Sequence, residues 1–130
     1  MRLYLDTDVW MALIRQEDRF HNAAKKWMQE NKDKHSFVTS TVSCLEIWFC
    51  LYRDHRMDVA LESVRAIARL ATVLPIGLHD IEQALVLAED HKLSPADALH
   101  AVLGLQHDGI ISSDKSFDRV SRLKRFDFTL

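Results

Sequence analysis

The chain has 130 residues, of which 48% are hydrophobic and 28% are charged, and its formal net charge is −2. This length and composition indicate one globular domain over 1–130 that is large enough to bury a core, and they exclude a disordered or fibrous protein. The net charge argues against a protein that binds nucleic acid over its whole surface.

Short apolar runs in the first half of the chain predict buried strands at 3–5 and 37–38. Apolar residues at helical spacing predict helices at 7–14, 20–28, 39–53 and 57–71. The last of these is strongly amphipathic. Cys44 and Cys50 would both lie on the third helix, about 9 Å apart along its axis, which is too far for a disulfide.

The second half continues the alternation of strands and helices. Strands are predicted at 73–74, 110–111 and 126–128, and helices at 80–91, 95–106 and 116–121. Asp80 with Gln83 resembles a helix-start box, and Pro95 suits a first helical position. The strands are continuous apolar runs, so we predict an α/β fold with three layers and a mainly parallel sheet of four to five strands.

Two further observations concern location. Asp6 interrupts the N-terminus before an apolar stretch develops, so no signal peptide is expected. The longest run without Asp, Glu, Lys or Arg is His35–Leu45, which is too short to span a bilayer. With two free cysteines, these features predict a soluble, cytoplasmic protein that contacts no membrane.

Acidic residues lie at or near predicted strand ends and helix starts, where the active sites of parallel sheets form. They are Asp6, Glu46, Asp97, Asp114 and Asp118. If they converge, they repel one another: two unit charges about 4 Å apart cost roughly 4 kcal/mol at an effective dielectric near 20. Such a cluster therefore implies a bound cation, and carboxylate oxygens suit Mg²⁺ or Mn²⁺.

Each acid also has a structural explanation. Asp6 and Asp114 can cap helices, Asp97 lies in a first helical turn where the helix dipole favours it, and Ser43 with Glu46 can form a capping box. Glu46 favours function because its neighbours on the same face are apolar. His100 lies one turn after Asp97 and can assist it, but a single histidine is more often a core or surface residue.

A basic segment follows the last acids. Between residues 115 and 125 there are five basic residues and one acid. A basic surface beside an acidic pocket suits a substrate that carries phosphate, although a solvated C-terminal segment explains the pattern equally well.

The order of these motifs resembles that of PIN-domain ribonucleases, in particular VapC-type toxins of toxin–antitoxin pairs. Residues 5–9 (Leu-Asp-Thr-Asp-Val) resemble the opening Asp-Thr/Ser-Asn motif, and 95–101 resemble the third acidic motif. Residues 111–118 resemble the Thr/Ser-Asp-x-x-Phe motif, and Glu46 takes the place of the second acid. Asp8 departs from the family, which usually has Asn there.

The resemblance implies a metal-dependent endoribonuclease with a PIN-like fold. Asp6, Asp97 and Asp114 would hold Mg²⁺ or Mn²⁺, with Glu46 in the same catalytic cluster. The accessory residues would be Thr7, Asp8, Ser113 and Asp118, and the contacts to RNA phosphate Lys115 and Arg119. The resemblance also implies a homodimer and an antitoxin partner, with the exposed faces around Trp10 and Trp27 as contact sites, although core packing is the simpler explanation for either Trp.

Two alternatives stay open at the level of sequence. Asp6 and Asp8 also resemble the Asp-x-Asp opening of haloacid-dehalogenase-type phosphatases, in which the first Asp is a nucleophile and the second a general acid. That reading leaves Glu46 and Asp97 without roles. The other alternative is a PIN domain that binds RNA without cleaving it.

Overall fold

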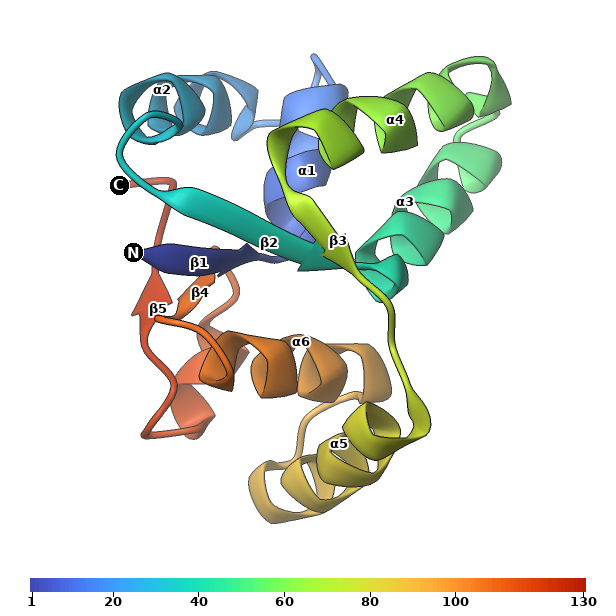
Figure 1. Ribbon diagram of the computed structural model, residues 1–130. Helices are drawn as coiled ribbons and strands as arrows, with labels where there is room; N and C mark the ends of the chain where they lie inside the picture. The colour runs from blue at the N-terminus through green and yellow to red at the C-terminus, as the bar shows by residue number, and fades with distance from the viewer.

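The computed structural model describes residues 1–130 as a five-stranded sheet with helices on both faces (Figure 1). The strands are β1 (Arg2–Leu5), β2 (Ser36–Ser40), β3 (Thr72–Leu74), β4 (Ile110–Ile111) and β5 (Arg125–Phe126). The α-helices are α1 (Thr7–Ile14), α2 (His21–Asn31), α3 (Thr41–Arg53), α4 (Ala60–Leu70), α5 (Leu78–His91) and α6 (Pro95–Leu105). Two 3₁₀ turns, η1 (Met57–Val59) and η2 (Lys115–Arg119), complete the chain.

All strand pairs are parallel, and the strand order is β3-β2-β1-β4-β5. This arrangement confirms the predicted three-layer α/β/α fold. The central strand β1 has β2 on one side and β4 on the other, because the chain runs outward from β1 through β2 to β3 and then crosses to β4 and β5 on the opposite side. Ligands of open α/β sheets bind at such a switch point, beyond the carboxyl ends of the strands, and Asp6 follows β1 there.

Alternate residues of the strands enter different cores, because successive side chains point to opposite faces of a sheet. Leu3 and Leu5 pack under α1–α4, whereas Tyr4 faces α5 and α6. On β4, Ile111 belongs to the core with Leu3 and Leu5, and Ile110 belongs to the core with Tyr4. Figure 1 shows the two helix layers above and below the sheet. Burial on both faces explains why these strands are apolar without alternation.

Several boundaries differ from the sequence prediction. Thr39 and Ser40 belong to β2, so α3 begins at Thr41 and not at residue 39. Thr39 accepts a hydrogen bond from the Trp10 indole and donates one to the backbone oxygen of Leu5. These tertiary contacts, together with pairing to β3, hold the two residues in the strand.

Smaller differences occur elsewhere. The amphipathic segment 57–71 divides into η1 and α4. Helix α5 begins at Leu78, two residues before the prediction, because the Asp80 carboxylate accepts a hydrogen bond from Gly77 N at the start of the helix. The last strand is Arg125–Phe126 rather than 126–128. Cys44 and Cys50 are both free thiols on α3. None of the helices is both long and apolar enough to traverse a bilayer.

Candidate active site

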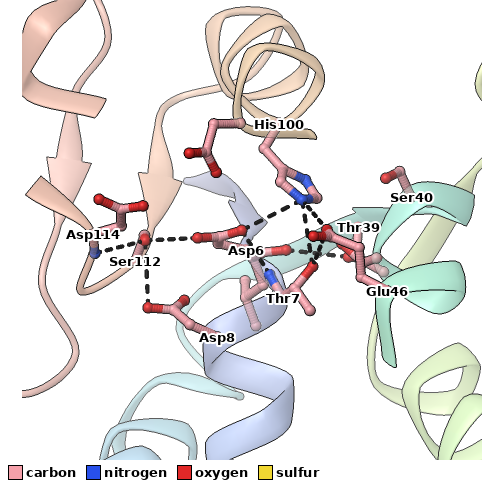
Figure 2. Close-up of polar contacts among 12 residues, drawn as sticks. Asp6, Thr7, Asp8, Thr39, Ser40, Glu46, His100, Ser112 and Asp114 are labelled. Atoms are coloured by element: carbon pink, nitrogen blue, oxygen red, sulfur yellow. Dashed lines mark hydrogen bonds and ion pairs between the residues drawn. The ribbon is translucent and has the colours of Figure 1, made fainter. Parts of the chain in front are cut away.

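Asp6 is the first residue after β1 and lies at the centre of a polar cluster (Figure 2). Its side chain is almost fully buried. One carboxylate oxygen accepts a hydrogen bond from Thr7 N at 2.8 Å, and the other accepts one from Ser112 Oγ at 2.8 Å. The first bond caps α1, so the structural role considered for Asp6 exists. The burial, which a cap does not need, points to an additional role.

Glu46 comes from α3 and approaches Asp6 on the side opposite Ser112 (Figure 2). Its Oε1 accepts a hydrogen bond from Thr7 Oγ1 at 2.7 Å and lies 2.5 Å from His100 Nε2. These contacts to His100 and Thr7 lower the pKa of Glu46 although burial opposes the charge. Helix α3 already starts at Thr41, so a capping box at Ser43 is not the explanation for Glu46.

Asp8, in the first turn of α1, turns toward the residues that follow β4. Its Oδ2 accepts hydrogen bonds from Ser113 N at 2.8 Å, from Ser113 Oγ at 2.5 Å and from Ser112 Oγ at 3.5 Å. Its Oδ1 is buried and has no hydrogen-bond partner. Burial raises the pKa of Asp8. The acid that departs from the family's Asn therefore points into the cluster.

Asp97 and Asp114 complete the acidic group. Asp97 lies in the first turn of α6, where its backbone N–H donates to Ser94 Oγ, and its carboxyl is half-buried. Burial raises the pKa of Asp97, and the charges of Asp114 and Glu46 raise it further. Asp114 caps η2 through a hydrogen bond from Ser116 N at 2.9 Å, and its own N–H donates to Ser112 Oγ.

Three of the other predicted residues, Asp118, Lys115 and Arg119, make no contact with this group. Asp118 is exposed and forms an ion pair with Arg125 at 2.9 Å, which lowers the pKa of Asp118. Lys115 is exposed, and Arg119 donates from Nη1 to the backbone oxygen of Lys92 at 2.8 Å. Ser113 and Thr7 do contact acids of the cluster, at Asp8 and Glu46.

The electrostatics of the cluster suit a cation. Burial and the charge of Asp8 raise the pKa of Asp6 to about 7, against the opposing effect of His100. The carboxylates are hard oxygen ligands, and the orphaned Asp8 Oδ1 lacks a positive partner. In the present side-chain positions, no three His, Cys, Asp or Glu residues converge tightly enough to enclose a metal ion. The donors are of the oxygen type that Mg²⁺ and Mn²⁺ prefer, but the side chains would have to move to enclose either ion.

Comparison with known proteins identifies the fold family. The sequence model of the PIN domain family matches residues 3–123. This range contains the acids of the cluster, which are Asp6, Asp8, Glu46, Asp97 and Asp114. The chain belongs to the PIN domain family. Membership in this family removes the phosphatase alternative, because a haloacid-dehalogenase nucleophile at Asp6 belongs to a different family.

Several solved structures share the architecture over almost the whole chain. The structure of VapBC2 from Rickettsia felis bound to a promoter DNA fragment matches this chain with a TM-score of 0.77 at 10% sequence identity. The match covers 98% of each chain. VapC20 from Mycobacterium tuberculosis, a Sarcin-Ricin loop cleaving toxin, matches with a TM-score of 0.77 at 21% sequence identity. The match covers 91% of this chain and 94% of VapC20. VapBC-1 from nontypeable Haemophilus influenzae matches with a TM-score of 0.77 at 17% sequence identity, and the match covers 100% of both chains.

At these identities the similarity establishes the shared fold. No curated protein matched the chain in a sequence search. The residues of this PIN domain must therefore carry the functional argument themselves. Sequence reasoning set one of them aside: His100 is fully buried and contacts both Glu46 and Asp6. Its position one helical turn after Asp97 was the only available signal.

Proposed function

We propose that this PIN domain is a metal-dependent endoribonuclease that acts as the toxin of a toxin–antitoxin pair. The observation that carries the proposal is the gathering of acids from separate elements around the buried Asp6. Family membership supports the same activity, because the resemblance of the motifs to VapC-type toxins extends along the whole chain in order.

Within this proposal, Asp6, Asp97 and Asp114 hold Mg²⁺ or Mn²⁺, and Glu46 completes the cluster. When bound, such an ion acidifies a water and neutralises the charge that develops on a phosphodiester. Thr7 Oγ1 orients Glu46 through the 2.7 Å hydrogen bond.

Phosphate would approach from the side of η2. Lys115 is exposed there, and the bond from Arg119 Nη1 to Lys92 leaves the other guanidinium donors available. Ser113, two residues before Lys115, orients Asp8 by two hydrogen bonds. Asp118 serves the same segment by pairing with Arg125.

The decisive test compares three substitutions at acids. Asp6→Asn and Asp97→Asn should each lower Mn²⁺-dependent cleavage of RNA at least about 100-fold, because each removes a ligand charge. Asp8→Asn should stay within about 10-fold of the natural chain, since the family usually has Asn there. Cleavage is followed on labelled RNA at a fixed Mn²⁺ concentration, with EDTA as the metal-free control.

Two outcomes would contradict the assignment. If Asp8→Asn eliminates cleavage while Asp97→Asn does not, the roles of the acids are wrong. If the natural chain binds RNA but does not cleave it with Mn²⁺, the non-catalytic alternative replaces the proposal.

An antitoxin would occupy the groove between α1 and the α3–α4 hairpin. This groove has a volume of about 510 Å³ and is lined by Leu13, Ile14 and Leu70 among other residues. Trp10 forms part of its floor but is buried, and Trp27 packs on Phe37, so both act mainly as core residues. Co-expression with the product of a short reading frame immediately upstream of the gene tests this partner.

A homodimer would form through the exposed apolar side of α3. Leu45, Trp48, Phe49 and Tyr52 lie together there, with 49%, 54%, 61% and 66% of their surfaces exposed. Contiguous aromatic residues of this kind are rare on monomers and typical of interface cores. We define this group as the α3 apolar surface.

A further inference from the structure

We propose that His100 is a positioning residue that holds Glu46 in the orientation needed by the acidic cluster. This inference rests on the proposed function, because it assigns His100 a role at the same site. It concerns a side chain that the four-acid motif does not include, and the contacts of the imidazole ring carry it.

His100 lies in the interior between β1 and α3. Its side chain is 1% exposed, and Tyr4 beside it is 0% exposed. His100 Nδ1 lies 2.7 Å from Tyr4 Oη, and Nε2 lies 2.5 Å from Glu46 Oε1. A continuous chain of contacts therefore connects Tyr4 on the central strand, through His100 on α6, to Glu46 on α3. Figure 2 shows the part from His100 to Glu46.

The direction of these hydrogen bonds follows from the partners. The Glu46 carboxylate can only accept, so the proton of the Nε2 contact resides on His100. Tyr4 Oη also contacts Ser40 Oγ at 2.8 Å and Ser43 Oγ at 3.4 Å, which fixes the phenol from the far side. The ring thus has one nitrogen anchored to the scaffold and the other directed at the site.

Glu46 needs such a restraint. Its side chain is 35% exposed, and only Thr7 and His100 bind it, both at Oε1. Oε2 receives no hydrogen bond from the protein. Two donors at one oxygen leave the other free to face a cation or one of its waters. Outer partners of this kind typically change metal affinity or activity 10–100-fold when they are removed.

His100 is poorly placed to be a metal ligand itself. Nε2 already contacts Glu46, Thr7 Oγ1 at 3.3 Å and Asp6 Oδ1 at 3.5 Å, whereas Nδ1 is turned away toward Tyr4. Imidazole is also a poorer match than carboxylate for Mg²⁺ and Mn²⁺. The geometry suits a donor that orients carboxylates.

A matched pair of uncharged substitutions tests the role. His100→Gln places an amide N–H near the position of Nε2, whereas His100→Asn is too short to reach Glu46. Because both variants lack the imidazole charge, the comparison isolates the hydrogen-bond donor. Mn²⁺ affinity is measured by electron paramagnetic resonance, and kcat and KM on labelled RNA.

We expect His100→Gln to stay within about 3-fold of the natural chain. His100→Asn should weaken Mn²⁺ binding and lower kcat about 10-fold or more, with KM unchanged. In a Glu46→Gln background the two variants should bind Mn²⁺ equally, because the acid on which His100 acts is gone.

Equal behaviour of the two variants in the natural background, or a difference that persists with Glu46→Gln, would overturn the inference. If His100→Asn does not fold by circular dichroism, Tyr4→Phe replaces it and should lower kcat several-fold at constant KM; no change would overturn the inference. A natural chain that neither binds Mn²⁺ nor cleaves RNA would instead refute the proposed function.

Discussion

Asp6 shows how burial and charge are combined at one residue. Because burial raises its pKa from 3.8 to about 7, the folded chain binds this proton more tightly than the unfolded chain does. Between about pH 4 and pH 7, the unfolded state loses the proton first, so this group makes folding less favourable as the pH rises. A cation that binds the ionised carboxylate should reverse the loss.

The resulting prediction concerns thermal stability. Mn²⁺ should raise the melting temperature markedly at pH 8 and little at pH 5, where a proton occupies Asp6. Asp6→Asn should stabilise the metal-free chain at pH 8, because it removes the buried charge, and should remove most of the response to Mn²⁺. Scanning calorimetry with and without Mn²⁺ measures both, and an equal Mn²⁺ shift at both pH values would contradict the prediction.

From the sequence we predicted that Asp6, Glu46, Asp97 and Asp114 form the cluster and that Asp118 is accessory, but the sequence could not show which of these side chains meet. Asp114, Asp97 and Asp118 are alike in sequence, each near a helix start, yet Asp118 turns outward to Arg125. Arg125 arrives from β5, so the pairing depends on a contact that no local pattern encodes. His100 was considered only as a possible assistant to Asp97, because its partners Tyr4 and Glu46 lie far away in the chain.

At the scale of elements, apolar runs and helical spacing were sufficient to predict every strand and every α-helix. The errors lie at boundaries, most clearly where β2 meets α3. Thr39 and Ser40 have no strong preference between strand and helix, and the choice is made by Trp10, by Leu5 and by pairing with β3. Such contacts exist only after the sheet has formed.

The turn into β4 offers a test at this scale. Gly109 has φ +147°, and a Cβ there would lie 2.5 Å from the backbone oxygen of Lys124. Gly109→Ala should therefore destabilise the fold by about 2 kcal/mol through strain and a clash with rigid backbone. Urea denaturation measures the loss. Gly77→Ala is the control, because its Cβ would meet nothing closer than 3.9 Å and its φ is ordinary; equal losses in both would argue against this explanation.

For the whole molecule, the α3 apolar surface and the groove between α1 and the α3–α4 hairpin should act independently. Phe49→Glu places a charge at the centre of the α3 apolar surface and should convert a dimer to a monomer. Leu70→Glu alters the groove between α1 and the α3–α4 hairpin and should leave the dimer intact while weakening the antitoxin complex. Sedimentation velocity and co-purification separate these effects. A Phe49→Glu variant that sediments as the natural chain does would exclude this interface.

The hydrogen bond between Asp6 and Ser112 spans 106 positions of the chain, from the end of β1 to the end of β4. A nascent chain that stops before β4 has no Ser112 to hold Asp6 and no Asp114 to join it. The cluster can therefore form only late in synthesis, after β4 has been made and has inserted beside β1. Under the proposed function, a chain truncated before β4 would therefore be inactive even if the rest of the sheet formed.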